Sequence, residues 1–239
     1  MNPYTLSENF DTQRYNRLPE VDNADSSIRR GGKFDKVFSE MALIFRRYEV
    51  AERFGVALLH KHNDCPDSTW MIEYCGRAQN KPALVTKLSD KSPRQESACP
   101  TVWQFDDSAY HPLEFSTDLC AKQLYDGGPV SPFFLKDFAS LLRNYSIYNY
   151  LGLAVVDRNL YRSAVDDEIA VEYSTYDRCN VVTLCSCSGL AYRTVETSWA
   201  FKGEDTQAES LCARYCRKSC VVILGQHGPS HGDLHTGHS

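Results

Sequence analysis

Two histidines separated by a single residue, His60 and His62, are the clearest candidates for chemistry in this sequence. Residues 56–63 begin with four apolar residues and predict a β-strand, and residues two apart on a strand point to the same face. The two imidazoles are therefore expected to be neighbours that act as acid and base or bind one metal ion. Two histidines supply only half of a zinc site. The candidates for a further ligand are His111, Glu114, Asp106 and Asp107.

Carboxylates form a second set of candidates because they lie on, or at the end of, apolar segments. The four are Glu73, Asp157, Glu172 and Glu196. In such a segment a carboxylate either faces solvent or has a function. Asp157 directly follows the most apolar segment and is the candidate catalytic residue of this set. The three glutamates are candidates to bind a cationic group of a substrate, such as a guanidinium.

Cysteines and histidines near the C-terminus are a third set of possible metal ligands. They are Cys212, Cys216, Cys220, His227, His231, His235 and His238. Their spacing is looser than the paired spacing typical of structural zinc sites. Cysteines in the core followed by a flexible tail account for the same pattern.

Basic residues concentrate in two segments of an acidic chain. They are Arg29, Arg30, Lys33, Arg46, Arg47, Arg53, Arg214, Arg217 and Lys218. If two helices carrying these segments lie side by side, the side chains form a basic strip that can hold the phosphates of RNA. Solvated helix faces with salt-bridge partners are the alternative interpretation.

Three helices and about seven strands are expected to position these residues. The predicted helices are 34–54, one that begins at Pro132 after Ser131, and one that begins at Thr206 with a capping box. The predicted strands are 56–63, 69–75, 82–88, 101–105, 150–156, 168–173, 180–187 and 190–199. The order favours an α+β domain with a mixed or mainly antiparallel sheet packed against about three helices. We expect a mobile polar arm over 1–32, a single domain over 33–224 and a flexible His/Gly-rich tail over 225–239.

Composition narrows the class of protein. The chain has 239 residues, 42% of them apolar, which is typical of a globular protein and excludes a disordered one. A net charge of −5 argues against a protein that coats DNA. No apolar run approaches the roughly 18 residues that span a bilayer, and the polar N-terminus lacks a secretory signal, so a cytoplasmic protein without membrane contact is expected. Dinucleotide and P-loop motifs are absent from the sequence.

One segment resembles a known family. Residues 54–62, Phe-Gly-Val-Ala-Leu-Leu-His-Lys-His, are similar to the segment F-G-V-x-L-L-H-[KR]-H of small fungal proteins, in which Phe usually follows and Asn63 stands here. In this way the chain resembles the fungal arginine-containing cyclodipeptide synthases. That resemblance implies an enzyme of secondary metabolism that joins aminoacyl groups from charged tRNA into a cyclic dipeptide, with no cofactor and no metal.

Three hypotheses follow. In the first, implied by the resemblance, His60 or His62 is the general base for the attacking amine, the basic strip binds the tRNA, and the glutamates bind the amino-acid moiety. The activated ester of the charged tRNA removes any need for ATP. The second is a metal-dependent hydrolase or lyase built on His60 and His62. The third is a binding protein without catalytic activity.

Overall fold

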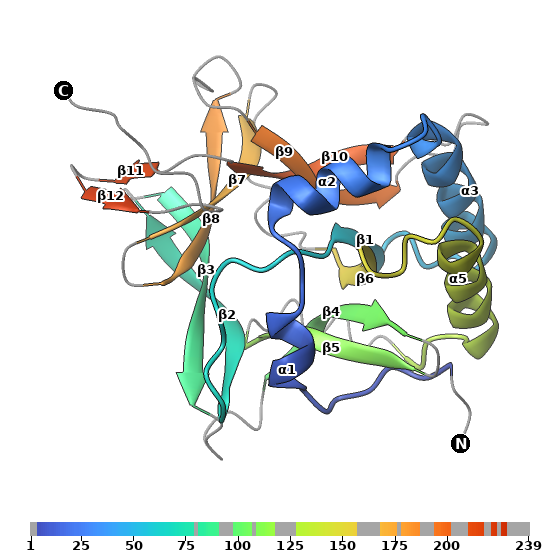
Figure 1. Cartoon of the computed structure of the whole chain (residues 1–239), viewed down its shortest axis with the longest axis horizontal. Helices are drawn as coiled ribbons and strands as arrows, with labels where there is room; N and C mark the ends of the chain where they lie inside the picture. The colour runs from blue at the N-terminus through green and yellow to red at the C-terminus, as the bar shows by residue number, and fades with distance from the viewer. Residues whose placement is uncertain are drawn as a thin grey trace.

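The computed structural model describes residues 4–78, 81–90, 98–106, 109–117, 128–156, 168–175, 178–186, 194–201, 210–217, 221–223 and 226–228. Ten strands close into a barrel in the order β1-β6-β4-β5-β2-β3-β8-β7-β10-β9 (Figure 1). Their bounds are β1 Phe54–Leu58, β2 Thr69–Ala78, β3 Lys81–Asp90, β4 Cys99–Phe105, β5 Tyr110–Ser116, β6 Leu151–Val155, β7 Glu168–Ser174, β8 Asn180–Ser186, β9 Thr194–Phe201 and β10 Ser210–Arg217. The short strands β11 (Val221–Ile223) and β12 (Gln226–Gly228) pair separately.

The sheet is mixed, as the sequence predicts. β2 pairs in parallel with β5, and β7 in parallel with β10, while the other pairs in the barrel are antiparallel. The described residues form four helices: α1 Thr12–Asn16, α2 Val21–Arg29, α3 Phe34–Arg47 and α5 Pro132–Asn144. Sequence alone did not indicate that the sheet closes on itself. None of the described helices is long and apolar enough to cross a membrane.

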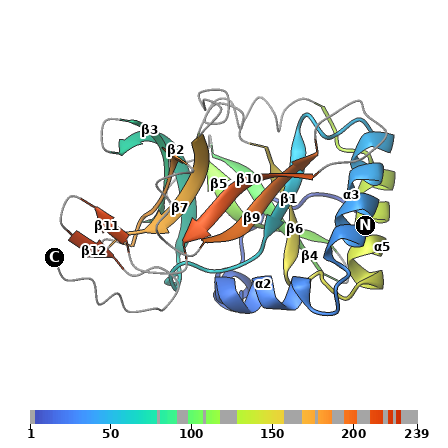
Figure 2. The ribbon, with the colours of Figure 1, turned by 90° about the horizontal axis from the view of Figure 1, so that it is seen from above.

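Helices α3 and α5 lie side by side at one end of the barrel (Figures 1 and 2). The apolar spacing on α3 brings Phe45 inward, where its ring lies 5.1 Å from Phe134, 5.5 Å from Phe138 and 4.7 Å from Phe201, between centroids. Phe134 and Phe138 come from α5 and Phe201 ends β9, so one buried aromatic cluster joins both helices to the sheet.

The predicted helix over 34–54 and the one that begins at Pro132 are both confirmed, but the first ends earlier than expected. α5 begins at Pro132 after Ser131, although the Ser131 side chain makes no capping hydrogen bond. α3 begins at Phe34 but ends at Arg47 rather than Phe54. Glu49, with a φ of 55°, turns the chain out of the helix and toward β1.

The expected polar arm is wrong for most of residues 1–32. Helices α1 and α2 occupy this segment, and Tyr15, Val21 and Ala24 are completely buried. α2 packs on β9 and β1. Its apolar residues recur at helical spacing, but they are few among polar neighbours, so the pattern was too weak to separate a packed helix from a loose segment.

The helix predicted from Thr206 is also wrong. Residues 210–217 form β10, which pairs antiparallel with β9 and parallel with β7, and residues 206–209 lie outside the described part of the chain. Pairing with two strands overrides a local helical pattern. β5 was missed because residues 106–130 read as irregular, with Pro112 inside the strand. Of the predicted tail, the structure describes only residues 226–228, which form β12.

Candidate metal centre

The two histidines lie on an irregular segment directly after β1. The predicted strand 56–63 ends at Leu58, where the Leu59 amide donates to the Tyr150 carbonyl at 2.7 Å and the chain leaves the sheet. The prediction that His60 and His62 lie on one face of a strand is therefore wrong, but the two imidazoles are neighbours as expected. Their ring centroids are 4.6 Å apart, at an interplanar angle of 60°.

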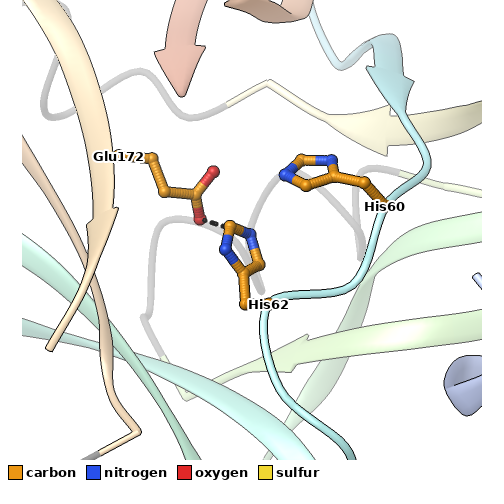
Figure 3. A group of neighbouring side chains, drawn as sticks. All are labelled: His60, His62 and Glu172. Carbon is orange, nitrogen blue, oxygen red and sulfur yellow. Dashed lines mark ion pairs between the residues drawn. The ribbon is translucent and has the colours of Figure 1, made fainter. Parts of the chain in front are cut away.

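The third member of the group is Glu172 on β7, more than a hundred residues further along the chain (Figure 3). His62 Nε2 lies 3.3 Å from Glu172 Oε1, and ligand atoms of His60, His62 and Glu172 all lie within 4.8 Å of one another. The side chains of His62 and Glu172 are 2% and 5% exposed, and His60 is buried. The fold thus gathers two imidazoles and a carboxylate away from solvent.

A backbone carbonyl fixes the tautomer of His60. Its Nδ1 lies 2.8 Å from the Leu58 carbonyl oxygen. A carbonyl only accepts hydrogen bonds, so Nδ1 carries the proton and Nε2 carries the lone pair. A ring nitrogen bonded to a backbone carbonyl, with the other nitrogen left as a base, is the usual arrangement of a metal-binding histidine.

The spacing of His62 and Glu172 fits two ligands of one divalent metal ion. Ligands at about 2.1 Å from a tetrahedral zinc lie roughly 3.4 Å from one another, close to the 3.3 Å between His62 and Glu172. Two imidazoles and one carboxylate leave one position for water or substrate, as in catalytic zinc sites. A buried carboxylate also needs a compensating positive charge, which a metal ion supplies.

The N-terminal segment clamps the loop that carries the histidines. The Asn16 side chain donates from Nδ2 to the Cys65 carbonyl at 2.9 Å and accepts from the Cys65 amide at 2.7 Å. The Lys61 amide, between the two histidines, donates to the Pro19 carbonyl at 3.0 Å. The position of both imidazoles therefore depends on α1 and the residues that follow it.

Replacing Asn16 with alanine is expected to weaken metal binding by about 10- to 100-fold, because the substitution releases the loop that orients the ligands. The same change removes two hydrogen bonds and costs about 1–3 kcal/mol of stability. Metal titration and urea unfolding measure the two effects. Asn9→Ala on the exposed part of the segment is the control. Equal metal affinity in the two variants would show that the clamp does not position the histidines.

Among the described residues, the other predicted site residues do not join this cluster. Glu196 lies on β9 with its side chain 33% exposed and pairs with Arg29 at 2.7 Å. Asp106 pairs with His111 at 3.2 Å and with Arg14 at 2.6 Å, so neither Asp106 nor His111 is the further ligand. Asp107 and Asp157 lie outside the described residues. Glu73 is buried on β2.

The predicted strip along two helices is wrong, because residues 210–217 form a strand. The described residues Arg214 and Arg217 belong to β10, and Lys218 lies outside the described part. Of the first segment, Arg29 pairs with Asp25 and Glu196, and Arg47 pairs with Asp137. These contacts fit the alternative of solvated basic side chains with acidic partners, and RNA binding stays a prediction.

The C-terminal cysteines and histidines are only partly described. Cys212 and Cys216 lie on β10, and His227 on β12. Cys220, His231, His235 and His238 lie outside the described residues, so the predicted metal cluster there stays a prediction.

Comparison with known proteins identified no relative: no family model, no curated protein and no solved structure matches this chain.

Proposed function

We propose that this chain is a metal-dependent hydrolase whose centre consists of His60, His62 and Glu172. One observation carries the proposal: three side chains of the ligand types that zinc prefers, from two distant segments, converge inside the protein with ligand atoms within 4.8 Å. Two buried imidazoles and a carboxylate are a costly group to leave without a cation.

Each ligand has a defined part. The Leu58 carbonyl holds His60 in the tautomer that presents Nε2. Glu172 orients His62 and contributes the negative charge of the set. A divalent metal bound there acts as a Lewis acid and activates water near neutral pH. In the hydrolysis, water oxygen bonds to the substrate carbonyl carbon, the bond to the leaving group breaks, and the leaving group takes a proton.

Hydrolysis is favoured over the tRNA-dependent synthesis by the position of Glu172. The first hypothesis offers Glu172, Glu196 or Glu73 to bind a cationic substrate, but Glu172 faces His62 and Glu196 pairs with Arg29. The synthesis of a cyclic dipeptide stays a prediction from the resemblance of residues 54–62, and both hypotheses use the same two histidines.

Metal analysis of the full chain tests the proposal. The protein is prepared without a histidine tag, with His227, His231, His235 and His238 changed to asparagine so that the tail histidines do not contribute ligands. After dialysis we expect about one zinc per chain, as in a mononuclear site. His60→Gln is expected to lose the zinc. His111→Gln, which changes a histidine outside the cluster, is expected to keep it.

The hydrolysis of para-nitrophenyl acetate by the same preparations completes the test. We expect activity that follows zinc content across the variants. Folded protein without bound metal overturns the proposal. Stoichiometric iron in place of zinc overturns the hydrolase assignment, since two histidines and a carboxylate also form the site of non-haem iron oxygenases.

A further inference from the structure

A row of buried polar residues crosses four neighbouring strands of the barrel. Glu73 on β2 is in register with Thr86 on β3, Thr86 with Asn180 on β8, and Asn180 with Ser174 on β7. Directly paired residues of antiparallel strands point to the same face. All four are buried. A continuous polar row of this kind is unusual in a sheet interior unless something polar contacts it.

This row is on the same side of the sheet as the candidate metal centre. Glu172 is two residues from Ser174 on β7 and so shares its face, and Glu172 contacts His62. On β2, Met71 shares the face of Glu73, and Met71 packs with Leu59 and Cys65, which flank the two histidines. The loop with His60 and His62 therefore lies against the polar face of the sheet.

Two donors near this face have no hydrogen-bond acceptor within the described part of the chain. Asn180 accepts from the Ser174 hydroxyl at 3.2 Å, but its Nδ2 is buried without an acceptor, and the residue is 1% exposed. The Tyr15 hydroxyl is likewise completely buried; the His62 amide lies at its oxygen, and its proton has no acceptor among the described residues. Native proteins pair almost all buried donors, so each such group points to a ligand that supplies the acceptor.

Tyr15 lies close to the ligands of the proposed metal. Its ring packs in one buried cluster with Leu59 and Cys65. Burial raises the pKa of its hydroxyl well above the usual value, and the negative charges of Glu114 and Glu172 raise it further. A tyrosine hydroxyl is protonated at neutral pH even with its ordinary pKa, so it is available as a donor.

The charges around Tyr15 and Asn180 indicate which kind of hydrogen-bond acceptor a ligand can offer to them. Glu172 beside His62 and Glu114 near Tyr15 place negative charge at this face, and negative charge repels an anion. None of the four residues in the polar row is basic. A carboxylate or phosphate group is therefore disfavoured, whereas an uncharged carbonyl oxygen accepts from Asn180 and Tyr15 without an electrostatic penalty.

We infer that the barrel interior beside His60, His62 and Glu172 is the substrate pocket, and that it binds uncharged ester or amide carbonyl compounds through Asn180 Nδ2 and the Tyr15 hydroxyl. The inference rests on the proposed hydrolase and adds its substrate class. A carbonyl oxygen that accepts from such a donor is bound more strongly as negative charge develops on it during attack by water.

Two pairs of compounds test the inference. Para-nitrophenyl acetate and para-nitrophenyl phosphate compare an uncharged ester with an anionic one, and we expect hydrolysis of the first alone. Benzamide and benzoate make the same comparison for binding by the metal-free protein, measured by NMR titration, and we expect only benzamide to bind. Because the binding assay needs no metal, it reports on the pocket even if the proposed activity is absent.

Tyr15→Phe is the most conservative variant, and Tyr110→Phe is its matched control. Tyr110 is equally buried, but its hydroxyl donates to the Leu135 carbonyl at 2.7 Å. We expect Tyr15→Phe to lower kcat/KM for the acetate ester by about 10- to 100-fold, the scale of a lost donor to a developing oxyanion, and to melt no lower than the parent. Tyr110→Phe is expected to lower the melting temperature and leave kcat/KM unchanged.

Asn180→Leu, of similar volume, gives an independent check and is expected to weaken benzamide binding and ester hydrolysis together. If Tyr15→Phe and Asn180→Leu both hydrolyse the ester and bind benzamide as the parent does, the pocket is wrong while the metal centre stands. If benzoate binds as well as benzamide, the substrate class is wrong. If zinc is absent but benzamide still binds through Tyr15 and Asn180, the pocket stands and the hydrolase is wrong.

Discussion

Replacing Glu172 with glutamine is expected to remove the bound metal and to slow ester hydrolysis by roughly 10³-fold, since a metal centre that contributes about 4 kcal/mol to the transition state corresponds to three powers of ten in rate. Glutamine keeps the size of the side chain and an oxygen that faces His62, but it loses the negative charge. The effect is therefore on the metal rather than on packing. Steady-state kinetics with para-nitrophenyl acetate and metal analysis measure it.

Chelation gives a second readout for the same variant. A metal that binds only the folded state raises stability by about 4 kcal/mol at a thousand times its Kd, so EDTA is expected to lower the melting temperature of the parent clearly. Glu172→Gln is expected to melt at the same temperature with and without EDTA. Glu196→Gln, which changes a carboxylate paired with Arg29 at the surface, is the control and should respond to EDTA as the parent does. An EDTA response retained in Glu172→Gln would show that Glu172 is not a ligand.

Truncating Phe45 to alanine is expected to cost about 3–5 kcal/mol of unfolding free energy, because the change leaves a cavity that the neighbouring rings cannot fill. Phe45 is completely buried where α3, α5 and the end of β9 meet. A domain of this kind has only about 5–15 kcal/mol in total, so the variant approaches the limit of folding. Guanidinium unfolding at equilibrium measures the loss.

Leu43→Ala is the control for Phe45. Leu43 lies on the same helix with 54% of its surface exposed, so its truncation is expected to change stability by no more than about 0.5 kcal/mol. Similar losses for the two substitutions would contradict the assignment of α3 as a helix that packs through the face of Phe45.

Local sequence patterns predicted the helices and strands in which apolar residues recur at a regular spacing. The apolar spacing of α3 and the proline at the start of α5 were sufficient to place both helices, and each of the eight predicted strands overlaps an observed strand. The failures were α1, α2, β5 and β10. In each of them, pairing or packing with distant segments outweighs a weak or misleading local pattern.

The candidate site also combines a feature that the sequence predicted with one that it did not. The spacing of His60 and His62 was enough to predict two neighbouring imidazoles, since residues so close in sequence remain close in most conformations. The role of Glu172 was different: the sequence marked it only as a carboxylate in an apolar strand, equal to Glu73 and Glu196. Closure of the barrel brings β7 to the loop after β1 and leaves Glu196 in an ion pair on the outside.

The residues that complete the site were set by the tertiary structure alone. Asn16 and Tyr15 belong to a segment that reads as polar and unstructured, and Asn180 reads as the first residue of an ordinary strand. Their importance comes from what surrounds them, namely the loop that Asn16 clamps and the buried donors of Tyr15 and Asn180. Burial and register are properties of the closed barrel, and no local spacing encodes them.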